Sequence, residues 1–102
     1  MKSYDKLVRD NIPDMIKKSG KQCDIDIIKD DRILEYLYVK LHEEIFELVD
    51  NENLDEIADV LEVVFSIGKK YGFTEDEMLI KRNEKRSQSG GFENHILLKN
   101  VY

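Results

Sequence analysis

The sequence predicts a mainly all-α fold built around an antiparallel helical hairpin. Two apolar stripes at helical spacing, with cap signals at the helix ends, carry this prediction. The first stripe consists of Leu34, Leu37, Leu41, Ile45 and Leu48, and the second of Ile57, Leu61, Val64 and Gly68, with Val60 and Val63 beside them. A chain of 102 residues has room for one hydrophobic core, so residues 1–102 are expected to form a single domain.

Residues typical of helix ends predict where the first two helices begin and where the first one ends. Pro13 suits the first turn of a helix, because its missing N–H needs no partner there, and a short helix is expected to run to about Ser19. Gly20 is expected to close this helix. Asp30 or Asp31 is suited to cap the first long helix.

The later helices begin at residues with the spacing of a capping box. Asn53 stands three residues before Glu56, and Thr74 stands three residues before Glu77. In each pair the side chains and backbone N–H groups can satisfy one another. A second long helix is therefore expected after Asn53, and a third from Thr74 to roughly Gln88.

Two segments outside the helices are expected to form short accessory β-strands. Residues 23–28 alternate apolar and polar side chains, and residues 95–101 contain an Ile-Leu-Leu run. The two are expected to pair with each other. They would need the helices behind them, because a two-stranded ribbon is marginally stable alone.

Composition excludes several classes of protein. The net charge of −6 argues against a general binder of nucleic acid or anionic membranes, which needs a positive field. No apolar run approaches the length that crosses a bilayer, and residues 1–6 lack the apolar core of a signal peptide, so a cytoplasmic location is expected. The single cysteine, Cys23, cannot form an internal disulfide and is expected to be a small buried residue.

The charge is divided along the chain. Residues 31–62 are rich in Asp and Glu, with Arg32 and Lys40 as their only Arg and Lys. Residues 81–86 reverse this balance with Lys81, Arg82, Lys85 and Arg86 against Glu84. An acidic stretch followed by a basic cluster indicates a site that handles a cation and an anion together.

Four acidic residues share a register in the expected hairpin. Glu44 and Glu47 are three apart on one helix, and Glu56 and Asp59 are three apart on the next, so each pair shares a helix face. The turn is centred between residues 51 and 52, and residues equidistant from that centre lie at the same height. Glu47 is therefore expected across from Glu56, and Glu44 across from Asp59.

A cluster of this kind would repel itself unless a cation bound there. Oxygen ligands without His or Cys favour Mg²⁺, with Mn²⁺ also suitable, over Zn²⁺. Because Mg²⁺ retains waters and is completed by substrate phosphates, a polyphosphate is the natural substrate. The alternative is that these acids form a solvated helix face.

The same residues resemble the signature of a known superfamily. Glu-Glu-x-x-Glu at residues 43–47 followed by Glu-x-x-Asp at residues 56–59 is similar to the pattern of the all-α nucleotide pyrophosphohydrolases, which include MazG, dimeric dUTPases and phosphoribosyl-ATP pyrophosphohydrolase. Residues 4–13 resemble the opening of a subgroup of small phosphoribosyl-ATP pyrophosphohydrolase-like proteins. Gly-Gly-Phe at residues 90–92, with Ile-Leu-Leu after it, resembles that subgroup's ending. The resemblance spans nearly the whole chain.

The resemblance implies a metal centre and a reaction. Its Mg²⁺ ligands would be Glu44, Glu47, Glu56 and Asp59, whereas Glu43 points away from that edge. It implies cleavage between the α and β phosphates, which releases a monophosphate and pyrophosphate. One position departs from the subgroup, because Ser89 stands where an Arg commonly precedes Gly-Gly-Phe.

Candidate phosphate-binding residues lie in the basic cluster. Lys81 shares a helix face with Lys85, and Arg82 shares one with Arg86, so either pair is suited to hold phosphates. The resemblance adds Asn83 and favours it with Lys85. The predicted phosphate-binding residues are therefore Lys81, Asn83, Lys85 and Arg86. The alternative is a solvated helix end whose basic residues complement the helix dipole.

Two further residues have open roles. Lys6 and Arg9 can reach the substrate from the N-terminal segment or pair with acids of the bundle. His42 precedes the acidic pair but is turned away from it by its helical angle, so it is expected to be a surface residue.

These features together predict a Mg²⁺-dependent nucleotide pyrophosphohydrolase in which Glu44 or Glu47 helps to take the proton of the attacking water. A homodimer or higher homo-oligomer is expected, because one small chain cannot bury both faces of its apolar stripes, and the resemblance implies the same. Neither a membrane nor a stable nucleic-acid partner is expected. Two alternatives stay open: a non-catalytic metal-binding helical interaction module, and the phosphoribosyl-ATP pyrophosphohydrolase of histidine synthesis.

Overall fold

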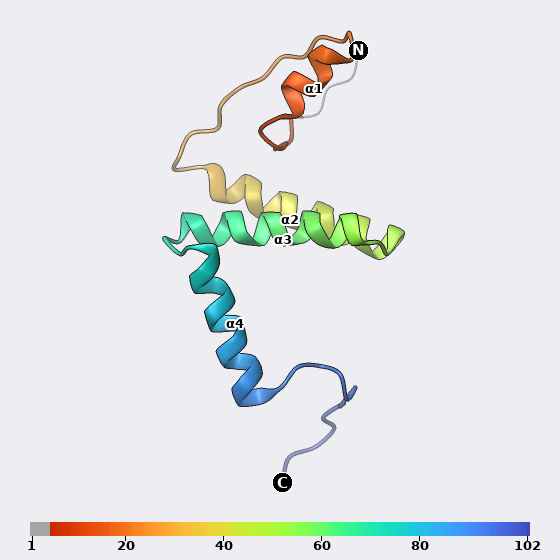
Figure 1. Ribbon diagram of the computed structural model, residues 1–102, viewed down its shortest axis with the longest axis vertical. Coiled ribbons are helices and arrows are strands. Elements are labelled where there is room, and N and C mark those ends of the chain that lie inside the picture. Colours follow the sequence, from red (N-terminus) through yellow and green to blue (C-terminus); the bar gives the residue numbers. More distant parts are fainter. Residues whose placement is uncertain (1–4) are drawn as a thin grey trace.

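The computed structural model describes residues 5–102, so Tyr4, the first residue of the N-terminal motif, lies outside them. The described residues form helices and no strands, which confirms the expected all-α class. The helices are α1 (Ile12–Lys18), α2 (Ile33–Asn51), α3 (Leu54–Lys70) and α4 (Glu75–Ser89). Figure 1 shows α2 and α3 side by side. In this view α1 lies above the two helices, and α4 leaves the end of α3 at a steep angle and runs downward.

The turn between α2 and α3 lies one residue later than predicted, because α2 continues through Asn51 and only Glu52 and Asn53 connect the two helices. Glu52 ends α2 in the left-handed conformation (φ 46°, ψ 52°), which reverses the chain within one residue. Asn53 then caps α3, because its Oδ1 accepts a hydrogen bond from the Glu56 N–H at 2.9 Å. This short connection fixes the register of the two helices.

The start of α2 differs from the prediction. Arg32, and neither Asp30 nor Asp31, is the N-cap residue, and its side chain forms no capping hydrogen bond. Asp30 instead forms an ion pair with Lys70 at the far end of α3. The carboxylate that was expected to cap one helix therefore ties the preceding loop to the other.

The hydrophobic core lies between α2 and α3. Leu37 on α2 and Val63 and Ile67 on α3 are its buried apolar residues. Leu7, Ile33, Leu34 and Leu41 are partly buried against them. Leu7 is one of the residues through which the N-terminal segment contacts the hairpin.

The position of α4 follows from a capping box and a glycine. Thr74 and Glu77 form both hydrogen bonds of the expected box, each at 3.1 Å. Gly68 is buried, and a Cβ at this position would collide with the thioether of Met78. The absence of a side chain at Gly68 therefore allows α4 to approach the end of α3.

The prediction of accessory strands is wrong. Residues 23–28 and 95–101 have no strand assignment, and no strand is present elsewhere in residues 5–102. In Figure 1 the first segment lies between α1 and α2, whereas the second lies in the tail beyond α4. The pairing fails because α4 carries the tail away from the other segment, and a short strand without a partner has no ladder to stabilise it.

A single chain leaves an unusually large surface exposed. Its radius of gyration is 17.9 Å, whereas a compact domain of this length has roughly 13 Å. Its accessible surface is 9538 Å², against roughly 6,000 Å² for a compact monomer of 12.0 kDa. None of the helices within residues 5–102 combines the length and apolarity needed to cross a membrane.

Part of this exposed surface is an apolar strip along one side of the hairpin. The strip consists of side chains that are between 41% and 66% exposed, and we call it the apolar hairpin face: Tyr38, Ile45, Val49, Ile57, Leu61 and Val64. Within each helix these residues are three, four or seven positions apart, so they share one helix face next to the stripe that packs into the core.

Candidate metal centre

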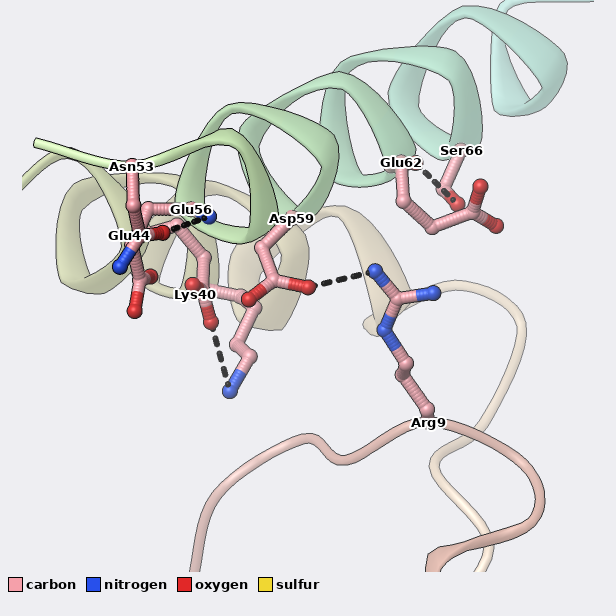
Figure 2. Close-up of polar contacts among 8 residues, drawn as sticks. All are labelled: Arg9, Lys40, Glu44, Asn53, Glu56, Asp59, Glu62 and Ser66. Carbon is pink, nitrogen blue, oxygen red and sulfur yellow. Dashed lines mark hydrogen bonds and ion pairs between the residues drawn. The ribbon is translucent and has the colours of Figure 1, made fainter. Parts of the chain in front are cut away.

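The hairpin brings three carboxylates together. Glu44 comes from α2, and Glu56 and Asp59 stand three residues apart near the start of α3. One carboxylate oxygen from each residue lies within 4.8 Å of the others. Figure 2 shows the three side chains converging below the two helices. We call these three residues the acidic site.

Two oxygens of the acidic site are buried without a partner. Glu44 is only 6% exposed, and its Oε1 lies 3.3 Å from the Lys40 Nζ. Its Oε2, and the Oε2 of Glu56, are inaccessible and accept no hydrogen bond within the described chain. Buried polar atoms are normally satisfied, because leaving one unpaired costs about 1–3 kcal/mol. A cation between these oxygens would supply the missing partner.

The electrostatics of the acidic site favour a proton or a cation. Burial raises the pKa of Glu44, and the charges of Glu47 and Asp59 raise it further, against the opposing effect of Lys40. Burial is also the largest cause of the raised pKa of Glu56, followed by the charges of Glu47, Asp59 and Glu44. The ionised carboxylates therefore repel one another in the absence of a counter-ion. An all-oxygen set of this kind suits Mg²⁺ or Mn²⁺.

Glu47 lies at the edge of this group rather than inside it. Its side chain is exposed, and it is not among the carboxylates whose oxygens converge. It is nevertheless near enough to Glu56 for its negative charge to raise the pKa of Glu56. The structure therefore assembles three of the four expected ligands and places the fourth beside them.

Two cationic side chains flank the acidic site. The Arg9 Nη2 donates a hydrogen bond to the Asp59 Oδ1 at 2.7 Å. Lys40 lies between Glu43 and Glu44, with its Nζ 3.3 Å from an oxygen of each. Of the two roles left open for Arg9, the structure shows pairing with an acid of the bundle. Lys40 was not among the predicted site residues. It stands four residues before Glu44 on a helix, and this spacing predicts that the two side chains are neighbours.

The basic cluster on α4 is separate from the acidic site within one chain. The side chains of Lys81, Asn83, Lys85 and Arg86 are all exposed. Figure 1 shows α4 leading away from the hairpin. Lys81 pairs with Glu84 at 2.9 Å, and Arg86 pairs with Glu93 at 2.7 Å.

Two cavities lie next to these charged groups. One of about 320 Å³ is lined by the N-terminal segment and α2: Asp5, Lys6, Leu7, Glu35, Tyr36, Val39, Lys40 and Glu43. The other, of about 710 Å³, is lined by the end of α4 and the glycines after it: Arg82, Lys85, Arg86, Ser89, Gly90, Gly91, Phe92 and Glu93. Lys40 joins the first cavity to the acidic site. Ser89 lies in the second cavity, where the resembled subgroup commonly has an Arg.

The remaining sequence candidates do not join the site. His42 is exposed on α2, as its helical angle predicts. Cys23 is half-buried, with its Sγ 4.0 Å from the carbonyl oxygen of Pro13.

Comparisons of the chain with models of protein families, with curated proteins and with solved structures found no match.

Proposed function

We propose that this protein is a Mg²⁺-dependent nucleotide pyrophosphohydrolase. The observation that carries the proposal is that Glu44 and Glu56, whose carboxylates converge with that of Asp59 in the helical hairpin, each have a buried oxygen without a partner. The spacing of these acids resembles the all-α nucleotide pyrophosphohydrolase signature, which adds the substrate class. We therefore expect a nucleoside triphosphate or a related compound as the substrate.

The residues of the acidic site have separate tasks in this reaction. Glu44, Glu56 and Asp59 would hold the ion. When bound, Mg²⁺ supplies charge neutralisation on the phosphates and makes water a better nucleophile. Glu47 is exposed beside Glu56, which suits it to accept the proton of the water that attacks phosphorus. The P–O bond of the α–β anhydride then breaks, and a monophosphate and pyrophosphate leave.

A substrate panel tests the proposal. Nucleoside triphosphates and phosphoribosyl-ATP would each be incubated with the protein and Mg²⁺, and pyrophosphate release would be measured. We expect Mg²⁺-dependent release from at least one compound and none from the Glu44→Gln variant. Activity restricted to phosphoribosyl-ATP would assign the protein to histidine synthesis. Release from none, together with equal binding of Ca²⁺ and Mg²⁺, would favour the non-catalytic interaction module.

We also propose that the working form is a homodimer joined through the apolar hairpin face. A single chain exposes far more surface than a compact monomer of its mass, and this excess exceeds one chain's half of the roughly 2,000–5,000 Å² that the two partners of an obligate homodimer bury together. A second copy has the same apolar strip on the same two helices. Four helices packed in this way would form a bundle with a continuous core.

A further inference from the structure

The N-terminal segment is attached to the hairpin at two points. Leu7 packs against the core cluster, and Arg9 bonds to Asp59, fifty residues away in sequence. Figure 2 shows Arg9 extending from a separate part of the chain toward Asp59 of the acidic site. The segment thus delivers a guanidinium group to the carboxylates that we expect to hold the ion.

Two positive side chains beside the acidic site oppose the binding of a cation alone. Arg9 and Lys40 each lie next to one of its carboxylates, and both would repel a divalent ion. Without an ion, the two side chains pair with the acids. With an ion bound, their charge is favourable when the ion arrives with an anion, because the two positive side chains then lie beside the added negative charge. A metal-bound polyphosphate has this combination of charges.

Arg9 has the geometry to contact such an anion. Its side chain is 54% exposed, and its recorded ion pair with Asp59 involves only Nη2. A guanidinium carries five N–H donors in a planar fork, which matches the oxygens of a phosphate. The donors not engaged by Asp59 can therefore bond to a phosphate held at the acidic site.

We propose that Arg9 is a phosphate-binding residue of the acidic site, held in position by Asp59 and supplied by the N-terminal segment. The proposal rests on the proposed function, because it takes the acidic site to bind an ion together with a polyphosphate. It goes beyond that function by assigning a substrate contact outside the basic cluster of α4. The competing interpretation is that the Arg9–Asp59 pair only fastens the N-terminal segment.

Binding measurements separate the two interpretations. Mg²⁺ alone, and tripolyphosphate in the presence of excess Mg²⁺, would be titrated into the full chain and into Arg9→Gln. Tripolyphosphate lacks a base and a sugar, so it reports on phosphate contacts only. We expect Arg9→Gln to bind Mg²⁺ at least as tightly as the wild type and to bind magnesium tripolyphosphate about tenfold more weakly, which corresponds to one charge-assisted hydrogen bond.

Two further variants serve as controls. Arg9→Lys keeps the charge but loses the planar fork, and we expect it to bind magnesium tripolyphosphate with intermediate affinity. Arg32→Gln removes an arginine that has a comparable surface ion pair, with Glu35 at 3.2 Å, and we expect wild-type affinities from it. Circular dichroism of all variants would verify that they are folded.

Each remaining outcome has a defined meaning. Unchanged affinity of Arg9→Gln for magnesium tripolyphosphate would overturn the assignment of Arg9 while leaving the proposed function intact. Loss of Mg²⁺ binding itself in Arg9→Gln would show that Arg9 only positions Asp59. If the wild type bound neither Mg²⁺ nor tripolyphosphate, the proposed function would fail and the role of Arg9 with it.

Discussion

At the scale of single residues, Glu44 combines features that are costly for stability. It is a buried carboxylate, it faces Glu56 and Asp59, and one of its oxygens has no partner. Lys40 offsets part of this cost through an ion pair with the other oxygen. Residues kept in such unfavourable surroundings are frequent at functional sites, where a ligand supplies the missing interaction.

Replacing Glu44 is expected to affect the ion-free and ion-bound proteins differently. Glu44→Gln keeps the volume but removes one charge, so in EDTA its melting temperature should equal or exceed that of the wild type. Saturating Mg²⁺ should stabilise the wild type by about 2.7 kcal/mol at a hundredfold excess over the dissociation constant, and the variant hardly at all. Thermal unfolding with and without Mg²⁺ measures both effects.

The control for this experiment is Glu84→Gln, which removes an exposed acid on α4 away from the acidic site. It should respond to Mg²⁺ as the wild type does. Equal stabilisation of Glu44→Gln and the wild type by Mg²⁺ would contradict the assignment of Glu44 as a ligand.

The pKa directions predict an unusual pH dependence of stability. The pKa values of Glu44 and Glu56 are raised in the folded state, so the folded protein takes up these protons first as the pH falls. Their protonation therefore stabilises the fold relative to neutral pH, and this stabilisation is lost as the pH rises through the raised values. In EDTA, the free energy of unfolding of the wild type should therefore rise relative to that of Glu44→Gln as the pH falls from neutral through the raised pKa values toward the ordinary carboxyl range.

Urea denaturation at several pH values measures this difference. The comparison with the variant cancels the contributions of other groups to the pH dependence of stability. One such group is Glu93, whose pKa is lowered by Arg86, so its contribution is lost as the pH falls. Mg²⁺ affinity should fall over the same pH window, because protons compete for the ligands. If the difference in the free energy of unfolding between wild type and variant did not change with pH, this would argue against repulsion within the acidic site.

At the scale of elements, the ends of the helices determine the geometry of the site. The left-handed Glu52 and the Asn53 cap set the register that brings Glu44 opposite Asp59. The next turn leads into the Thr74–Glu77 capping box, which starts α4 with a fixed direction. Local side-chain to backbone bonds thus position residues that are distant in the sequence.

The capping box on α4 is expected to contribute measurably to stability. Thr74→Ala removes the acceptor for the Glu77 N–H and should lower the free energy of unfolding by about 1 kcal/mol. Ser87→Ala, an exposed change inside the same helix, should be neutral or slightly stabilising, because Ala has the higher helix propensity. Urea titrations of both variants measure these values. Equal effects of the two changes would mean that the cap is not important.

At the scale of the whole molecule, one chain has too small a core for its surface. The buried apolar residues within residues 5–102 are Leu37, Val63 and Ile67. The apolar hairpin face continues this core to the outside. By helical spacing it lies on the side of the hairpin away from Glu47 and Asp59, so association would leave the acidic site open to substrate.

Association through the apolar hairpin face predicts a clear effect on mass. Light scattering after gel filtration should give the wild type twice its chain mass of 12.0 kDa. Leu61→Glu places a charge in the middle of the face and should shift the protein to the monomer mass with a lower melting temperature. Met15→Glu, an exposed change on α1, should leave the dimer intact. A wild type of monomer mass would contradict the proposed interface.

Local signals in the sequence determined most of the helical architecture. Periodic apolar residues gave α2 and α3, and the capping residues Asn53 and Thr74 located two helix starts, because these interactions span only three or four residues. The same short-range logic placed Glu44 opposite Asp59 across a tight turn. The prediction that Asp30 could cap α2 was wrong, because the Asp30 carboxylate forms an ion pair with Lys70, forty residues away in the sequence.

Only the tertiary structure decided which of these groups meet. It grouped Glu44 with Glu56 and Asp59, left Glu47 at the edge, paired Arg9 with Asp59, and kept the basic cluster of α4 apart within the chain. It also separated the two segments that were expected to pair as strands. These outcomes depend on how whole helices and loops are placed in space, which periodicity and spacing along the chain do not encode.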